Sequence, residues 1–135
     1  MNPYKCLNAY RNCGRVEDYE RWLDGAEMSV REAKGIVKLG YNNTVSFKCN
    51  QAAEFALKAL QIHRYKKFDK AHELAVLAAK LDAPANIVRA CEELYPYYVI
   101  SRYPDVKVEV SGSKAEHLIE LSEEVVKWSK SQTEK

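Results

Sequence analysis

The sequence predicts an all-α protein, an up-and-down antiparallel bundle of about five helices. The chain has 135 residues but only five glycines and four prolines, and a scarcity of these residues favours long helices. Apolar residues recur at steps of three and four, the spacing of amphipathic helices. Hydrophobic residues make up 47% of the chain and charged residues 30%, which is typical of a globular domain. We expect the bundle to cover residues 16–130, between a lead-in at 1–15 and a polar tail at 131–135.

Two helices are predicted in the N-terminal half of the chain. One apolar face extends along the first of them, from residue 16 onward: Tyr19, Trp22, Leu23, Ala26, Val30, Ala33 and Val37. Gly40 is expected to end this helix, because glycine readily adopts the left-handed conformation of a helix C-terminus. The second helix is predicted at roughly Thr44–Arg64, where alanines and leucines cover more than half of the helical circumference.

Three further helices complete the predicted bundle. Asp69 is the expected N-cap of the third helix, and Pro84 suits the first turn of the fourth. Pro96 either kinks the fourth helix or begins a separate short helix. Ser113, followed three residues later by Glu116, matches a capping box and predicts the start of the last helix.

Composition and spacing argue against several classes of protein. The net charge of +2 is too small to indicate nucleic-acid binding by itself. The chain contains no phosphate loop, dinucleotide fingerprint or zinc-binding spacing, so no metal or cofactor is expected. No two of the four cysteines form a C-x-x-C pair. The longest apolar run, Leu74–Ala79, is far shorter than the roughly 20 residues that cross a bilayer. With no signal peptide recognised, reduced thiols and a cytoplasmic location are expected.

The predicted second helix carries a polar stripe along its otherwise apolar surface. In "SFKCNQAAEFALKAL" (46–60) and the residue that follows it, five polar residues gather within about 100° of the helical wheel: Asn50, Gln51, Glu54, Lys58 and Gln61. Glu54 precedes Lys58 by four positions, the favourable order for an ion pair along a helix. The stripe is either a solvated edge of the bundle or one wall of a cleft.

Two other segments combine charged and aromatic residues. The run "HRYKKFDKAH" (63–72) is either a solvated loop or a phosphate-binding surface, and His72 within it is a candidate either for a helix-end hydrogen-bond network or for catalysis. In "SRYPDV" (101–106), Arg102 is suited to phosphate and Tyr103 to stacking on a base. The alternative for this segment is a helix terminus at which Arg102 pairs with Asp105.

Four stretches together resemble the HEPN domain, the higher eukaryotes and prokaryotes nucleotide-binding family. They are "RWLDGAEMSVREAK" (21–34), "SFKCNQAAEFALKALQI" (46–62), "AHEL" (71–74) and "SRYPDV" (101–106). The resemblance implies an antiparallel helical bundle, a homodimer and a link to nucleotides or RNA. It also implies, for many relatives, a small nucleotidyltransferase partner in a toxin–antitoxin pair. Other relatives are ribonucleases with an arginine followed four to six residues later by histidine, and Arg102 has no histidine at that distance.

Three functions are therefore consistent with the sequence. The first is a homodimeric binding module for a nucleotide, RNA or a nucleotidyltransferase, with seven candidate ligand-binding residues: Gln51, Glu54, Lys58, His72, Arg102, Tyr103 and Asp105. The second is a metal-independent ribonuclease in which His72 and Arg102 are the candidate catalytic residues. The third is a purely structural dimerisation module.

Overall fold

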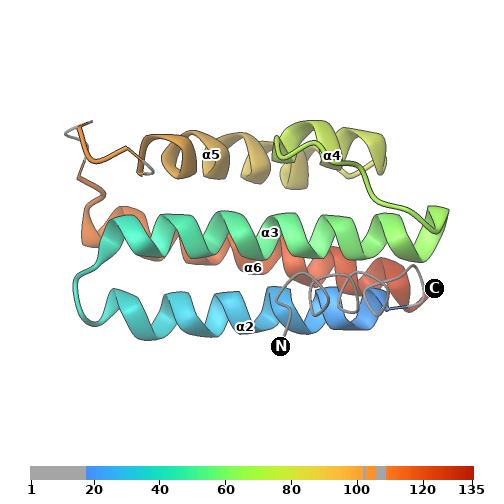
Figure 1. Ribbon diagram of the computed structural model, residues 1–135, viewed down its shortest axis with the longest axis horizontal. Coiled ribbons are helices and arrows are strands. Elements are labelled where there is room, and N and C mark those ends of the chain that lie inside the picture. Colours follow the sequence, from blue (N-terminus) through green and yellow to red (C-terminus); the bar gives the residue numbers. More distant parts are fainter. Residues whose placement is uncertain (1–17, 102, 106–108) are drawn as a thin grey trace, which may run out of the picture.

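The computed structural model describes residues 18–101, 103–105 and 109–135, and within them the protein consists of helices and connecting segments without a strand (Figure 1). The five helices are α2 (Tyr19–Val37), α3 (Asn42–Tyr65), α4 (Leu74–Lys80), α5 (Ala85–Ser101) and α6 (Gly112–Thr133). The predicted all-α class is therefore confirmed. The lead-in predicted at 1–15 lies outside the described residues, and α6 includes the first three residues of the predicted polar tail.

The helices form three layers, with α3 in the middle layer. Figure 1 shows α2 on one side, α3 and α6 between, and α4 with α5 on the other side. Helix α3 contacts each of the other described helices. Four small residues allow these close approaches, since all of them are completely buried: Ala52, Ala53, Ala56 and Ala59. The broad apolar surface of this segment is explained by its central position.

The core divides into two clusters on either side of α3. The larger cluster joins α3 to α4, α5 and α6 and contains Leu57, Leu77 and Leu118, each completely buried. A smaller cluster joins α2, α3 and α6. Burial also raises the pKa of Cys49 and of Cys91 to about 12, so these thiols stay protonated and pack as small hydrophobic groups. Within the described ranges, no helix combines the length and apolar composition needed to cross a membrane.

Two helix starts differ from the sequence-based expectations, and the structure decides between the two alternatives for Pro96. Helix α4 has Glu73 as its N-cap rather than Asp69, because the Asp69 carboxylate accepts a hydrogen bond from the Ala71 N–H and closes a turn there. Helix α6 is capped by Ser111, whose hydroxyl accepts from the Lys114 N–H, rather than by Ser113. Helix α5 continues through Pro96 as one element.

Candidate functional site

Residues 66–73, here called the connector, join α3 to α4 and run back along α3 (Figure 1). The reversal begins at Lys66, the C-cap of α3, which has a left-handed backbone with φ of 60°. Its N–H donates to the carbonyl oxygen of Ile62, so the helix ends with a satisfied last turn. The chain then lies against α3 without regular structure until α4 begins at Leu74.

The connector lies on the polar stripe of α3. The Asp69 N–H donates to Gln61 Oε1 at 3.1 Å. His72 Nδ1 is 3.4 Å from Glu54 Oε1. Gln61 and Glu54 are seven residues apart, or two turns along one face of α3, so the connector runs antiparallel to the helix. The part of the stripe from Glu54 to Gln61 is therefore covered by this chain's own connector and is not a solvated edge.

A buried ion pair forms the centre of the stripe. Lys58 Nζ is 3.2 Å from Glu54 Oε2, and the two side chains are only 5% and 14% exposed. Because charges lose their hydration on burial, such a pair tolerates the loss of neither partner. The same Glu54 carboxylate also contacts His72, whose side chain is 67% exposed. Glu54 thus links an internal cation to a solvent-exposed imidazole.

An aromatic cluster fixes the position of the connector from the side of α2. The Trp22 ring lies 5.4 Å from Phe55 of α3 and 5.1 Å from Phe68 of the connector, measured between ring centroids. Lys58 Nζ lies 5.4 Å from the centroid of the Phe68 ring, within the range of a cation–π contact. Phe68 therefore packs between an indole on α2 and an ammonium on α3.

The outer side of the connector, together with Tyr65 at the end of α3, presents cations and aromatic rings to solvent. We call Tyr65, Lys66, Lys67, Phe68 and Lys70 the basic–aromatic surface. The three lysines are exposed and make no ion pair with other residues in the part of the chain that the structure describes. Tyr65 is 49% exposed and Phe68 is 39% exposed. Free ammonium groups beside exposed rings are suited to phosphates and to stacked bases.

Arg64 belongs to the same basic run but has a structural role. Its guanidinium donates to the Leu81 carbonyl oxygen at 2.7 Å and to Gln132 Oε1 at 3.0 Å. These bonds tie the end of α3 to the turn after α4 and to the end of α6. The cations that remain available to a ligand are thus those of the connector itself.

The remaining predicted site residues lie elsewhere. Gln51 accepts a hydrogen bond from the Ser29 hydroxyl at 3.2 Å and thereby joins α3 to α2. Tyr103 and Asp105 are exposed and follow α5, whose Tyr98 ring lies 5.6 Å from Phe47 near the start of α3. Arg102 lies outside the described residues.

The predicted site residues therefore do not gather in one place. Phe47 and Lys58 are eleven positions apart, or about 16 Å along a helix. Figure 1 places the end of α5 at the end of the bundle opposite to the reversal between α3 and the connector. The structure brings together Glu54, Lys58 and His72, and it does not bring Tyr103 or Asp105 to them.

Two residues that sequence reasoning did not include in the site complete it. Gln61 belongs to the polar stripe and holds the connector through the Asp69 N–H. Asp69 also pairs with Lys80 of α4, and the hydrogen bond from that ammonium is the main cause of a lowered pKa for the Asp69 carboxyl group. The spacing of Gln61 from Lys58 on one helical face was visible in the sequence, whereas the Asp69–Lys80 pair has no local sequence signal.

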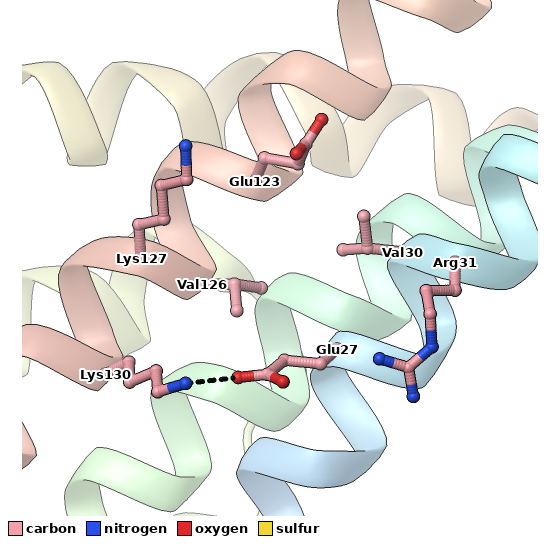
Figure 2. Close-up of a pocket in the computed structure, with 7 residues that line it drawn as sticks. All are labelled: Glu27, Val30, Arg31, Glu123, Val126, Lys127 and Lys130. Carbon is pink, nitrogen blue, oxygen red and sulfur yellow. Dashed lines mark hydrogen bonds and ion pairs between the residues drawn. The ribbon is translucent and has the colours of Figure 1, made fainter.

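A separate hollow of about 320 Å³ lies between α2 and α6. Figure 2 shows Val30 and Val126 between the charged side chains, while Arg31 and Lys127 point to opposite sides. Lys130 Nζ is 3.1 Å from Glu27 Oε1. The cations of this hollow are thus either paired with an acid or directed apart, and they do not converge on a common ligand.

Across residues 18–101, 103–105 and 109–135, no group of three or more His, Cys, Asp or Glu side chains is arranged to hold an ion. The candidate site can position a connector, bind an anion on its outer side and orient the His72 imidazole with a carboxylate.

Comparisons with known proteins agree with this fold. The sequence pattern of the HEPN domain matches residues 19–132. TT1696 from Thermus thermophilus has a similar structure, with a TM-score of 0.77 and 28% identity over 84% of this chain and 97% of that one. ST0689, an archaeal HEPN homologue, gives a TM-score of 0.73 and 30% identity over 88% of this chain and 98% of its own. A search of curated proteins found no match. The match across nearly all of the helical bundle shows that this chain belongs to the HEPN domain family.

Proposed function

We propose that this chain is a binding module for a nucleotide or RNA, that it works as a homodimer, and that a small nucleotidyltransferase is its partner. The observation that supports this class of ligand is the basic–aromatic surface at the end of α3 and on the connector. Its three lysines have no acidic partner among the described residues, and Tyr65 and Phe68 are exposed beside them. Membership of the HEPN family supports the same ligand class.

The buried contacts beneath the connector explain how a segment without regular structure can present a binding surface. The bonds to Gln61 and Glu54 and the packing of Phe68 hold the connector in one conformation. A surface that is ordered before binding loses less conformational entropy when a ligand arrives. In this proposal Glu54 and Lys58 are positioning residues, whereas the connector lysines and His72 face the ligand.

The homodimer is supported by apolar side chains at the opposite end of the bundle. Large apolar groups are exposed on the turn between α2 and α3, on the first turns of α3 and after α5: Leu39, Tyr41, Phe47 and Tyr103. Aromatic residues are enriched at protein interfaces relative to the rest of the surface. In the proposal this end forms the subunit interface, which leaves both connectors free for ligand and partner.

Binding to a short single-stranded RNA, followed by fluorescence anisotropy at several salt concentrations, tests the ligand. The triple variant Lys66→Gln, Lys67→Gln and Lys70→Gln is expected to bind at least about tenfold more weakly. Because each phosphate contact on a single strand contributes roughly 0.7 to the salt dependence of log K, the slope should fall by about 2 in this variant.

A matched triple variant on other surfaces provides the control. Arg31→Gln, Lys38→Gln and Lys127→Gln remove the same charge from exposed positions on α2, just after α2 and on α6, away from the connector. This variant should retain the affinity and salt dependence of the wild type. Equal losses in both variants would show that only net charge matters, and absence of RNA and nucleotide binding by the wild type would contradict the proposal itself.

One observation favours a metal-independent ribonuclease as the second candidate. The exposed His72 ring has its Nδ1 atom 3.4 Å from the partly buried Glu54 carboxylate. A carboxylate that orients an accessible imidazole is a common arrangement for a general base. The cation that would stabilise the phosphate in this reaction is assigned to Lys67 or Lys70 on the connector.

A further inference from the structure

A cavity of about 320 Å³ opens where α3, the connector and the end of α4 meet. Six residues line it: Gln61, Tyr65, Lys67, Phe68, Asp69 and Lys80. Ligand-binding cavities usually measure about 300–1,000 Å³, so this one is large enough for a single small ligand only. It differs from the hollow between α2 and α6 because its cations and aromatic rings border one space.

The charges that line the cavity favour an anion. Lys67 is exposed and has no ion-pair partner among the described residues. Lys80 pairs with Asp69, which is the only carboxylate in the lining. Two ammonium groups against one carboxylate leave a positive excess. The Asp69 carboxylate has two partners, because it also accepts a hydrogen bond from the Ala71 N–H at 2.9 Å.

The aromatic residues of the lining favour a planar group on the same ligand. Tyr65 and Phe68 are partly exposed, and their rings offer flat apolar surface next to the two lysines. The Phe68 ring is already fixed by Trp22 and Lys58 on its inner side. A ring that is ordered beforehand stacks on a base at a low entropic cost.

We infer that this cavity binds one phosphorylated ligand with a planar ring, of the size of a mononucleotide. Lys67 and Lys80 bind the phosphate, with Lys80 bridging it to Asp69, and the ring packs on Tyr65 or Phe68. The inference rests on the proposed function, which supplies the ligand class, and it adds the position of the ligand and a limit of one nucleotide per chain.

Isothermal titration of the full chain with adenosine monophosphate tests this inference. One site per chain is expected, and both adenosine and inorganic phosphate alone should bind more weakly than the joined ligand. Lys67→Gln and Lys80→Gln should each weaken binding by about tenfold, because each removes one charged hydrogen bond to the phosphate. Both side chains are on the surface, so the variants should retain the wild-type melting temperature. Lys38→Gln, an exposed lysine at the other end of the bundle, should bind as the wild type does.

The outcomes separate this inference from the proposed function. Wild-type affinity for adenosine monophosphate in both cavity variants would overturn the assigned position, while nucleotide binding itself would stand. Binding of RNA without binding of the mononucleotide would overturn the inferred ligand and leave the RNA-binding proposal intact. Absence of both would overturn the inference together with the proposed function.

Discussion

Replacing Glu54 with alanine should lower the free energy of unfolding by about 3 kcal/mol, the usual cost of leaving one member of a buried ion pair alone. Lys58 would keep its buried position, with 4% of its surface exposed, but would lose the carboxylate that lies 3.2 Å from its ammonium group. His72 would lose the same contact. The connector should therefore become mobile as the chain becomes less stable.

Equilibrium unfolding in urea measures this loss, and a second carboxylate on the protein provides the control. Glu32 pairs with Lys48 at 3.5 Å, with the two side chains 44% and 23% exposed. Because exposed pairs contribute little, Glu32→Ala should cost less than about 1 kcal/mol. Equal losses in the two variants would contradict a special role for the pair beneath the connector.

If the chain is a ribonuclease, a substitution of His72 should have the largest effect on the rate of RNA cleavage. A metal-independent ribonuclease should cut RNA in the presence of EDTA, and His72→Ala should slow this cleavage by about 100-fold or more, as expected for loss of a general base. The measurement is the initial rate on a fluorescent RNA. If the chain is a binding module without catalytic activity, the wild type should show no cleavage above background.

His117 is a matched control for this experiment. It is also a half-exposed histidine beside a glutamate, with its Nε2 atom 3.0 Å from Glu93 Oε1, but it lies on α6 away from the connector. His117→Ala should leave any cleavage unchanged. Activity that persists in His72→Ala would identify a contaminating nuclease and would exclude the ribonuclease alternative for this residue.

The helical fold was predictable from the sequence because each helix carries a local signal. Alanine-rich apolar faces predicted α3, and its central position in the bundle explains why so large a share of its circumference is apolar. The helix ends were less predictable. Ser111 and Ser113 are both good capping residues, and only the packing of the whole chain decides that Ser111 accepts from the Lys114 N–H.

The candidate site was only partly predictable, because the sequence indicates Glu54, Lys58 and His72 as site residues but not Gln61 or Asp69. The polar stripe of α3 was apparent from spacing alone, yet the sequence left open whether water or a cleft faced it. The answer depends on the reversal at Lys66, where a lysine adopts a left-handed conformation that usually favours glycine. No local pattern predicts that reversal, so the contacts of Gln61 with Asp69 and of Glu54 with His72 were visible only in the folded chain.

A nuclear magnetic resonance titration of the isotope-labelled full chain with a short single-stranded RNA tests the central claim most directly. That claim is that the polar stripe of α3 holds the connector so that its outer side binds the ligand. Backbone amide shifts should change most at residues 65–72, and Val30, Arg31 and Lys127 of the hollow between α2 and α6 should stay unchanged. Shift changes centred on that hollow, or on residues 41–47 and 103–105 at the other end of the bundle, would contradict the account.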